Sequence, residues 1–413
     1  MLSRNAKVVL LTGLYFAQGL PWGFFTQAFP VILRQRGSSL KEIGLVGLLN
    51  LPWALKFLWS PLVDRWSGSP LGPRRGWILP LQAAAVLLLC AVGALDVSQA
   101  TGGLFWVGVG FLLLNTVSAT QDIATDGLAV TLLTDAERGL GNGVQVGGYR
   151  LGMIVGGGFL LVLYSALGWQ AAFGLMAGLT LLSSVPIWLY REARGVVQAA
   201  PAAAVAPRLA WWPTLVSLSR RPGALRWAGV LCLYKTGDAM ATGMIRPLLV
   251  DRGLGVDDVG WLLGTAGSAA ALAGAAVGGL LLSRMERRTG LLAFGVMQLL
   301  SVAVWIWPAA GPISSNGLYA VSIFEHFANS MATVALFTAM MDVCDPEQAG
   351  TDYTVQACLV VIASGGLGVL SGFAADALGY LGHFSVATVA CGLTVLATAA
   401  LTRDGLPHAP QRG

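Results

Sequence analysis

Residues 8–33 read VVLLTGLYFAQGLPWGFFTQAFPVIL and contain no charged side chain. A bilayer core about 30 Å thick needs roughly 20 mostly apolar residues per helix, so this stretch predicts a membrane-spanning helix. We expect a retained span rather than a cleaved signal peptide, because the apolar run is too long. Eleven more stretches of this kind follow, at 43–63, 77–95, 103–132, 140–166, 169–190, 223–250, 258–282, 289–308, 316–342, 350–375 and 380–402.

The composition of the chain agrees with a polytopic membrane protein. Of its 413 residues, 55% are hydrophobic and 11% are charged, and the mean hydropathy is +0.70. Soluble domains carry about 25% charged residues, so a nucleic-acid-binding protein is excluded and a soluble enzyme is disfavoured. Three histidines and five scattered cysteines form no metal-binding spacing, so no metal or other cofactor is predicted. We expect an all-α membrane protein.

The distribution of Lys and Arg predicts the orientation. With twelve spans, both termini and alternate loops lie on one side, which holds 17 of the 25 basic residues, whereas the opposite loops hold only Arg34, Arg36, Lys41 and Arg252. Cytoplasmic loops are enriched in Lys and Arg, so both termini are predicted to be cytoplasmic.

The predicted spans form two sets of six with similar loops. LRQRGSSLKEIG (33–44) parallels LVDRGLGVDDVG (249–260), and PLVDRWSGSPLGPRRG (61–76) parallels GLLLSRMERRTG (279–290). We expect a six-helix bundle at 1–190, a cytoplasmic linker with an interfacial segment at 191–222, a second six-helix bundle at 223–402 and a cytoplasmic tail at 403–413. Two parallel six-helix repeats are the plan of the major facilitator superfamily.

Longer strings resemble one branch of that superfamily, the AmpG-like muropeptide permease family. They are LYFAQGLPWGF (14–24), LPWALKFLWSPLVDR (51–65), QDIATDGLAV (121–130), GNGVQVGGYRLGMIVGG (141–157) and DPEQAGTDYTVQ (345–356). The resemblance implies a multi-pass protein of the bacterial inner membrane that imports anhydro-muropeptides together with protons and takes part in peptidoglycan recycling. The expected partners are a small-molecule solute, protons and the lipid bilayer, with no nucleic acid, and the expected state is a monomer.

Other functions remain open at this point. The wider group includes acetyl-coenzyme A transporters, so the alternatives are transport of another bulky anionic solute, such as a coenzyme A thioester, or export of a drug or metabolite. Some muropeptide permeases carry two helices beyond twelve, for which this chain has no room. An intramembrane enzyme would need a nucleophile–base pair or a motif such as HExxH, and neither is present, so no enzyme is predicted.

Ionisable residues inside apolar spans are costly and mark candidate functional sites. Asp122 and Asp126 lie one helical turn apart on the fourth span, and two acids on one face repel, which favours proton binding by one of them. We expect Asp122 to pair with Arg150 and Asp126 to exchange protons; permanent ion pairing of both acids is the alternative. The predicted proton-coupling residues are Asp126, Glu325, Asp122 and Asp238.

A second cluster is expected from Lys235 and Asp238 on the seventh span and Glu325 on the tenth, with Glu325 as the acid in excess. His326 either assists Glu325 or is a packing residue. The resemblance implies a cavity lined mainly by the first, fourth, seventh and tenth spans. The candidate solute-binding residues are Tyr15, Gln18, Trp22, Lys56, Gln121, Gln145, Tyr149, Arg150, Tyr234, Lys235, His326 and Asn329.

The loop after the second span resembles the superfamily's signature, an acid at a helix end followed by basic residues. We expect Asp64, Arg65, Arg74 and Arg75 to form a cytoplasmic gate, in which Asp64 meets arginines and the N-terminus of a neighbouring helix.

Overall fold

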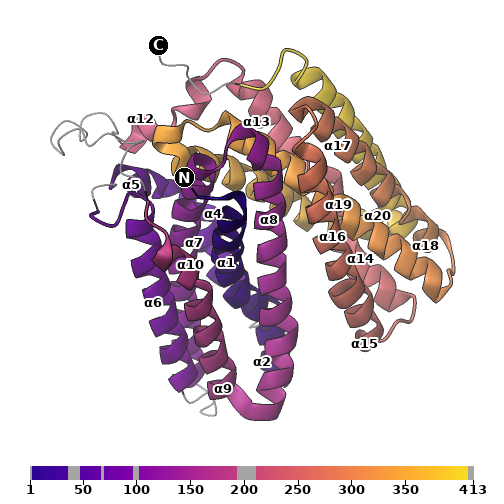
Figure 1. Cartoon of the computed structure of the whole chain (residues 1–413). Helices are drawn as coiled ribbons and strands as arrows, with labels where there is room; N and C mark the ends of the chain where they lie inside the picture. The colour runs from indigo at the N-terminus through magenta and orange to yellow at the C-terminus, as the bar shows by residue number, and fades with distance from the viewer. Residues whose placement is uncertain (1, 36–46, 67–68, 96–101, 193–210, 408–413) are drawn as a thin grey trace. The chain divides into compact units, whose positions relative to one another are not determined.

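The computed structural model describes residues 2–35, 47–66, 69–95, 102–192 and 211–407, and within these ranges it contains helices and no strand (Figure 1). The helices up to residue 189 are α1 (Arg4–Gly23), η1 (Phe24–Ala28), α2 (Phe29–Gln35), η2 (Gly47–Asn50), α4 (Leu51–Leu55), η3 (Lys56–Leu58), α5 (Ser60–Arg65), α6 (Arg75–Ala94), α7 (Gly102–Leu132), α8 (Asp135–Ile154), η4 (Val155–Phe159), α9 (Leu160–Ser183) and α10 (Val185–Leu189).

The remaining helices follow the linker. They are α12 (Trp211–Leu215), η5 (Leu218–Arg220), α13 (Ala224–Leu233), α14 (Thr236–Asp251), α15 (Val256–Val259), η6 (Gly260–Gly267), α16 (Ser268–Leu282), α17 (Arg287–Ala303), α18 (Ile306–Ala310), α19 (Ser315–Val343), η7 (Pro346–Gln348) and α20 (Ala349–Leu401).

Over the described residues each of the twelve predicted spans is mainly helical, although several spans are interrupted and residues 43–46 of the second span lie outside the described residues. Gly168 has a φ of 82° inside α9, and Gly379 has a φ of 67° inside α20. These left-handed glycines turn the chain between consecutive spans without a longer loop. Among the described residues, seven helices are long and apolar enough to cross a membrane, and one of them, Asp135–Leu189, contains two predicted spans.

The chain divides into two compact units. The first comprises Met1–Leu132, Gly148–Val216 and Asp345–Val355, and the second comprises Leu133–Gly147, Ser217–Cys344 and Gln356–Gly413. This division departs from the predicted halves at two segments. The beginning of α8 belongs to the second unit, and the beginning of α20 belongs to the first. Most of the predicted linker, residues 193–210, lies outside the described residues.

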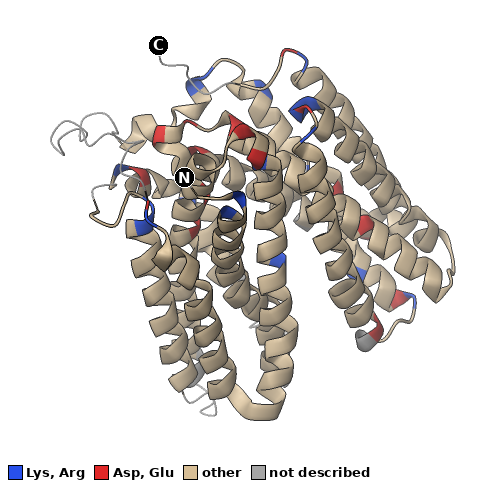
Figure 2. Cartoon of the chain, viewed as in Figure 1, with Lys and Arg blue, Asp and Glu red and all other residues tan. Residues whose placement is uncertain are grey.

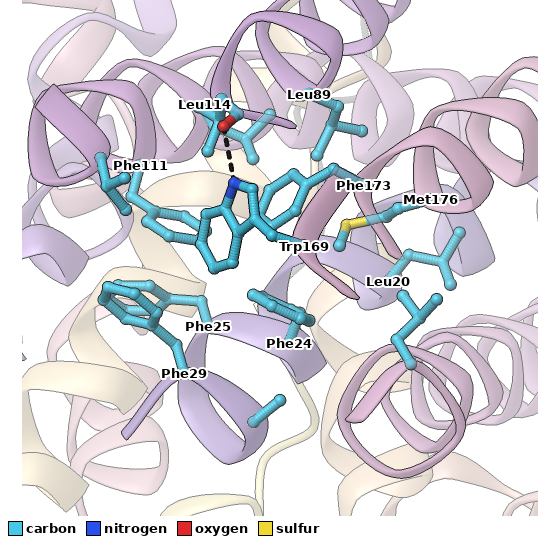
Figure 3. Packing of buried hydrophobic residues seen from close by; sticks show 14 of the residues in the cluster. Leu20, Phe24, Phe25, Phe29, Leu89, Phe111, Leu114, Trp169, Phe173 and Met176 are labelled. Carbon is cyan, nitrogen blue, oxygen red and sulfur yellow. Dashed lines mark hydrogen bonds between the residues drawn. The ribbon is translucent and has the colours of Figure 1, made fainter. Parts of the chain in front are cut away.

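An aromatic core fills the first unit (Figure 3). Trp169 donates its indole N–H to the carbonyl oxygen of Val92 over 2.9 Å and lies 4.4 Å from Phe173 between ring centroids. Phe24 and Phe111 stack at 6.3 Å. Buried aromatic side chains contribute large apolar contact areas, so this cluster fastens α6, α7 and α9 to the first span.

Glycines let α1 and α8 approach closely within the same unit. A Cβ at Gly19 would clash with the carbonyl oxygen of Tyr149, and one at Gly152 would clash with that of Phe16. Small residues permit such backbone contact between membrane helices. Gly156 is packed in the same way, because a Cβ there would meet the carbonyl oxygen of Leu20.

The second unit has its own core and the same type of helix contact. Trp305 stacks on Phe384 with ring centroids 6.1 Å apart. Gly274 on α16 leaves no space for a Cβ beside the backbone of Phe327 on α19. Each unit therefore buries its own apolar residues, as a compact bundle does.

Charged residues in the first unit gather toward the end of the helices where the N-terminus lies, whereas α9 and nearly all of α6 are free of charge (Figure 2). Long uncharged helical surfaces are what a lipid environment requires. The few charges inside the spans are therefore candidates for function.

Candidate functional site

The first polar cluster consists of Tyr15, Lys56, Asp122 and Asp126, all in the first unit. The two carboxylates project from the same face of α7, as their spacing predicts. Lys56 forms an ion pair with Asp122, and the Tyr15 hydroxyl donates to Asp126 over 2.8 Å. Asp126 is 1% exposed and Lys56 is 4% exposed. Two acids and one lysine are thus buried together.

Lys56 reaches Asp122 because the second span is not a regular helix. It changes from α4 to the short 3-10 turn η3 at Lys56 and begins again as α5 after Trp59, whose φ is −114° and ψ is 1°. The ion pair at Asp122 therefore comes from a residue that depth counting did not identify. The expected pair between Asp122 and Arg150 stays a prediction; Arg150 lies half-buried on α8 in the same unit.

Amides and aromatic rings extend this cluster. Gln18 donates to the Thr125 hydroxyl over 3.3 Å, and Trp53 donates its indole N–H to Asn115 over 3.3 Å. Trp22 meets Trp53 edge to face at 5.3 Å. Gln18 Oε1 and Gln121 Nε2 are buried without a hydrogen-bond partner in the described part of the chain. Buried amides normally find partners, so these two atoms are candidates for contact with a polar solute.

The second polar cluster, in the second unit, consists of Lys235, Asp238, Gln298, Glu325, His326 and Asn329. Lys235 lies 3.0 Å from Asp238, and Asn329 donates to Asp238 over 2.6 Å and to Glu325 over 3.4 Å. His326 Nδ1 lies 2.6 Å from Glu325 Oε2. The expected grouping of Lys235, Asp238 and Glu325 is therefore present, with Asn329 bridging the two acids.

Gln298 is a member of this cluster that sequence reasoning missed. It lies on α17, is 2% exposed, and accepts a hydrogen bond from Lys235 Nζ over 2.8 Å. A lone glutamine inside an apolar span was the available signal.

Of the remaining candidate residues, Tyr234 uses its hydroxyl for a contact with the backbone. Tyr234 is buried and donates its hydroxyl to the carbonyl oxygen of Leu291 over 2.8 Å, as a packing residue does. Gln145 belongs to the second unit. Tyr149 follows Gly148, at which the first unit resumes, and belongs to the first unit. Their role as solute contacts stays a prediction.

The signature loop forms a buried network within the first unit. Asp64 is buried, pairs with Arg74, and accepts hydrogen bonds from the backbone N–H of Gly350 at 3.2 Å and of Thr351 at 2.6 Å. The Thr351 hydroxyl also donates to Asp64, over 2.5 Å. An acid here meets both an arginine and the N-terminus of α20, which is the arrangement expected from the sequence.

The neighbouring basic residues differ in their surroundings. Arg75 donates to the carbonyl oxygens of Ile187 at 3.1 Å and Trp188 at 2.7 Å, whereas Arg65 is exposed. Glu192, which sequence reasoning did not single out, accepts hydrogen bonds from the backbone N–H of Arg74 and of Arg75, both at 2.9 Å. It thereby caps the beginning of α6.

Sequence reasoning also missed a network of charged residues in the second unit, because its members are far apart in the chain. Asp342 at the end of α19 accepts from Arg138 over 2.8 Å and from Arg287 over 2.6 Å. All three belong to the second unit. Within the described residues, no group of three or more metal-binding side chains was found.

Comparison with known proteins agrees with this architecture. A family model described as Major Facilitator Superfamily matches residues 11–368. The chain is similar to the human organic anion transporter MFSD10 (TETRAN), with a TM-score of 0.71 at 15% sequence identity over 96% of this chain and 100% of that one. That likeness concerns the fold.

Two relatives match nearly the whole chain. The anhydromuropeptide permease of Escherichia coli (strain K12) is 32% identical over 403 residues, 95% of this chain and 79% of the relative. An uncharacterized protein of Haemophilus influenzae is 29% identical over 394 residues, 92% of this chain and 91% of the relative. The protein is therefore a multi-pass transporter that belongs to the Major Facilitator Superfamily and, within it, to the AmpG-like family of muropeptide permeases.

Proposed function

We propose that this transporter imports anhydromuropeptides across the bacterial inner membrane and that proton entry drives the import. The observation that carries the proposal is the similarity to an anhydromuropeptide permease along 95% of the chain. An anhydromuropeptide combines sugar rings, amides and carboxylates, so its binding calls for aromatic faces, amide groups and cations. Trp22, Trp53, Gln18, Gln121 and Lys56 offer this chemistry within the first unit.

The buried acids support proton coupling. Asp126 and Glu325 belong to different units, and each lies in a network that holds a single lysine and two carboxylates. A carboxylate in a low-dielectric site binds a proton more readily than one in water, because burial disfavours the charged form. We therefore expect each network to change its charge by one proton during transport.

The mixture of charges favours this solute over a coenzyme A thioester. The phosphates of a thioester would call for several unpaired cations, whereas Lys56 and Lys235 each contact an acid in the same cluster. A zwitterionic sugar–peptide matches a site with both signs of charge.

Uptake by purified protein in liposomes tests the proposal. We expect labelled anhydro-disaccharide–peptide to accumulate inside when the outer solution is more acidic, and an uncoupler to abolish accumulation. Unlabelled anhydro-disaccharide should compete, and a coenzyme A thioester should not. Uptake that does not depend on the proton gradient would refute proton coupling. Competition by the thioester and not by the anhydro-disaccharide would indicate that the thioester is the transported solute.

A further inference from the structure

The seventh span is interrupted beside the second polar cluster. Helix α13 ends at Leu233 and α14 begins at Thr236, and Lys235 between them has a φ of −104° and a ψ of 7°. Such interruptions release backbone carbonyls from helical hydrogen bonding, and in membrane helices other groups must satisfy them. Discontinuous helices often lie at the binding sites of transporters.

Gln298 of α17 contacts this interruption through both ends of its amide. Its Nε2 donates to the carbonyl oxygen of Tyr234 over 3.0 Å, and its Oε1 accepts from Lys235 Nζ over 2.8 Å. One buried side chain therefore holds the backbone at the break and the ammonium that follows it. Gly237, in the first turn of α14, has no space for a Cβ beside Cys391, so the beginning of α14 is packed tightly against α20.

Asn329 connects Lys235 to the acid in excess. Its Oδ1 accepts from Lys235 Nζ over 3.2 Å, and its Nδ2 donates to Asp238 at 2.6 Å and to Glu325 at 3.4 Å. A continuous series of hydrogen bonds thus runs from Glu325 through Asn329, Lys235 and Gln298 to the carbonyl oxygen of Tyr234. We call this series the amide relay.

Charged and titratable groups face Glu325 from its own helix and from the seventh span. His326 lies beside it on α19, and Lys235, in the break before α14, and Asp238, in the first turn of α14, belong to the same cluster. Among the described residues, the neighbouring η6 and α16 carry no charged residue, and α17 carries Arg287 and Arg288 at its beginning. A proton on Glu325 therefore acts directly on His326 and Asn329, which contact its carboxylate.

We propose that Gln298 is a positioning residue that transmits the charge state of Glu325 to the break between α13 and α14. The inference rests on the proposed function, because it takes Glu325 as a carrier of the transported proton. With Glu325 ionised, Asn329 and Lys235 are drawn toward two carboxylates. A proton that binds a Glu325 oxygen removes the negative charge of that carboxylate, so Asn329 and Lys235 shift toward Asp238. Because Gln298 accepts a hydrogen bond from Lys235, its own hydrogen bond to the carbonyl oxygen of Tyr234 then changes.

Two substitutions at Gln298 test the two hydrogen bonds that its amide forms. Gln298→Leu removes both hydrogen bonds, whereas Gln298→Glu keeps an acceptor for Lys235 and, when ionised, loses the donor to Tyr234. In both we expect exchange of solute for solute to persist, the pH dependence of uptake to flatten, and uphill accumulation to fall by at least roughly 5-fold, the lower end of the usual range for coupling between sites. Gln298→Asn tests whether a shorter amide restores part of the effect.

Gln356→Leu is the matched control. Gln356 is a fully buried glutamine in the same unit, and it accepts the Trp227 indole N–H over 2.6 Å, away from the relay. This variant loses a comparable buried hydrogen bond, so we expect lower thermal stability with the accumulation ratio and pH profile of the wild type.

The outcomes distinguish the relay from the function on which it rests. If the wild type shows no proton-driven accumulation, the proposed function fails and the relay with it. If the wild type accumulates solute and both Gln298 variants keep its pH profile, the relay alone is refuted. In a Glu325→Gln background we expect Gln298→Leu to have no further effect on the pH profile, and additive effects would also refute the relay.

Discussion

At the scale of single residues, neighbouring acids on one helix face have different partners. Asp122 pairs with Lys56, whereas Asp126 accepts a hydrogen bond from a neutral donor, the Tyr15 hydroxyl. The Lys56 ammonium brings a positive charge to Asp122, whereas the Tyr15 hydroxyl brings none to Asp126. We therefore expect Asp126, rather than Asp122, to carry the transported proton in the first unit.

Neutralising a proton-binding acid should uncouple transport. We expect Asp126→Asn or Glu325→Gln to abolish uphill accumulation while exchange of solute across the membrane continues. One charge moving across 100 mV supplies about 2.3 kcal/mol, which corresponds to roughly 50-fold accumulation, so the loss is large enough to measure. Flux assays in liposomes with and without an imposed gradient check it. If both variants still concentrate solute, the coupling acid is another one, and Asp238 is the next candidate.

Removing the charge of Asp122 should destabilise the protein. Asp122→Asn leaves the buried Lys56 ammonium without its carboxylate, and breaking a buried ion pair in this way costs about 3–5 kcal/mol. We expect lower expression and a lower Tm in detergent. Adding Lys56→Met, which removes the buried ammonium, should recover much of the loss. A Tm equal to that of the wild type in Asp122→Asn would show that this pair contributes no stability.

At the scale of elements, one carboxylate ties the end of α5 to the beginning of α20. Asp64 accepts backbone hydrogen bonds from Gly350 and Thr351 and pairs with Arg74, which is held in turn by Glu192 through its backbone N–H. A carboxylate is favoured at a helix N-terminus by the backbone N–H groups and by the helix dipole. Three segments of the first unit, namely the end of α5, the residue before α6 and the beginning of α20, thus meet at one buried acid.

We expect Asp64→Asn to slow turnover without abolishing solute binding, because the amide keeps one acceptor oxygen but loses the charge that attracts Arg74 and the helix end. Initial uptake rates and equilibrium binding to the same preparation measure the two effects separately. Arg65→Gln, at an exposed neighbouring position, serves as the control and should transport at the wild-type rate. Wild-type turnover in Asp64→Asn at equal expression would exclude a gating role.

At the scale of the whole molecule, the distribution of basic residues predicts which loops face the cytoplasm. In a background without the five native cysteines, we expect Pro70→Cys to react with a membrane-impermeant thiol reagent only from the cytoplasmic side. Pro312→Cys, in the exposed loop between α18 and α19, should react only from the periplasmic side. The reverse pattern would overturn the predicted orientation. Residue 38, in the loop after the first predicted span, is also expected to react only from the periplasmic side and lies outside the described residues.

The sequence alone was enough to predict the spans, the family and the pairing of Asp122 with Asp126 and of Lys235 with Asp238 along single spans. Hydropathy is a local property, and a span needs only enough apolar residues in a row, so all twelve segments could be read without coordinates. Spacing along one helix is local as well, which is why the shared face of Asp122 and Asp126 and the proximity of Lys235 and Asp238 could be predicted.

Only the tertiary structure decided which partners these acids have. Counting depth along a span assumes a constant rise per residue, and the breaks at Lys56 and at Tyr234–Lys235 violate that assumption. Lys56 therefore reaches Asp122, and Gln298 contacts the open backbone of the seventh span, although neither contact follows from spacing. The same holds for Glu192 and for the segments 133–147 and 345–355, whose packing depends on contacts between residues far apart in the chain.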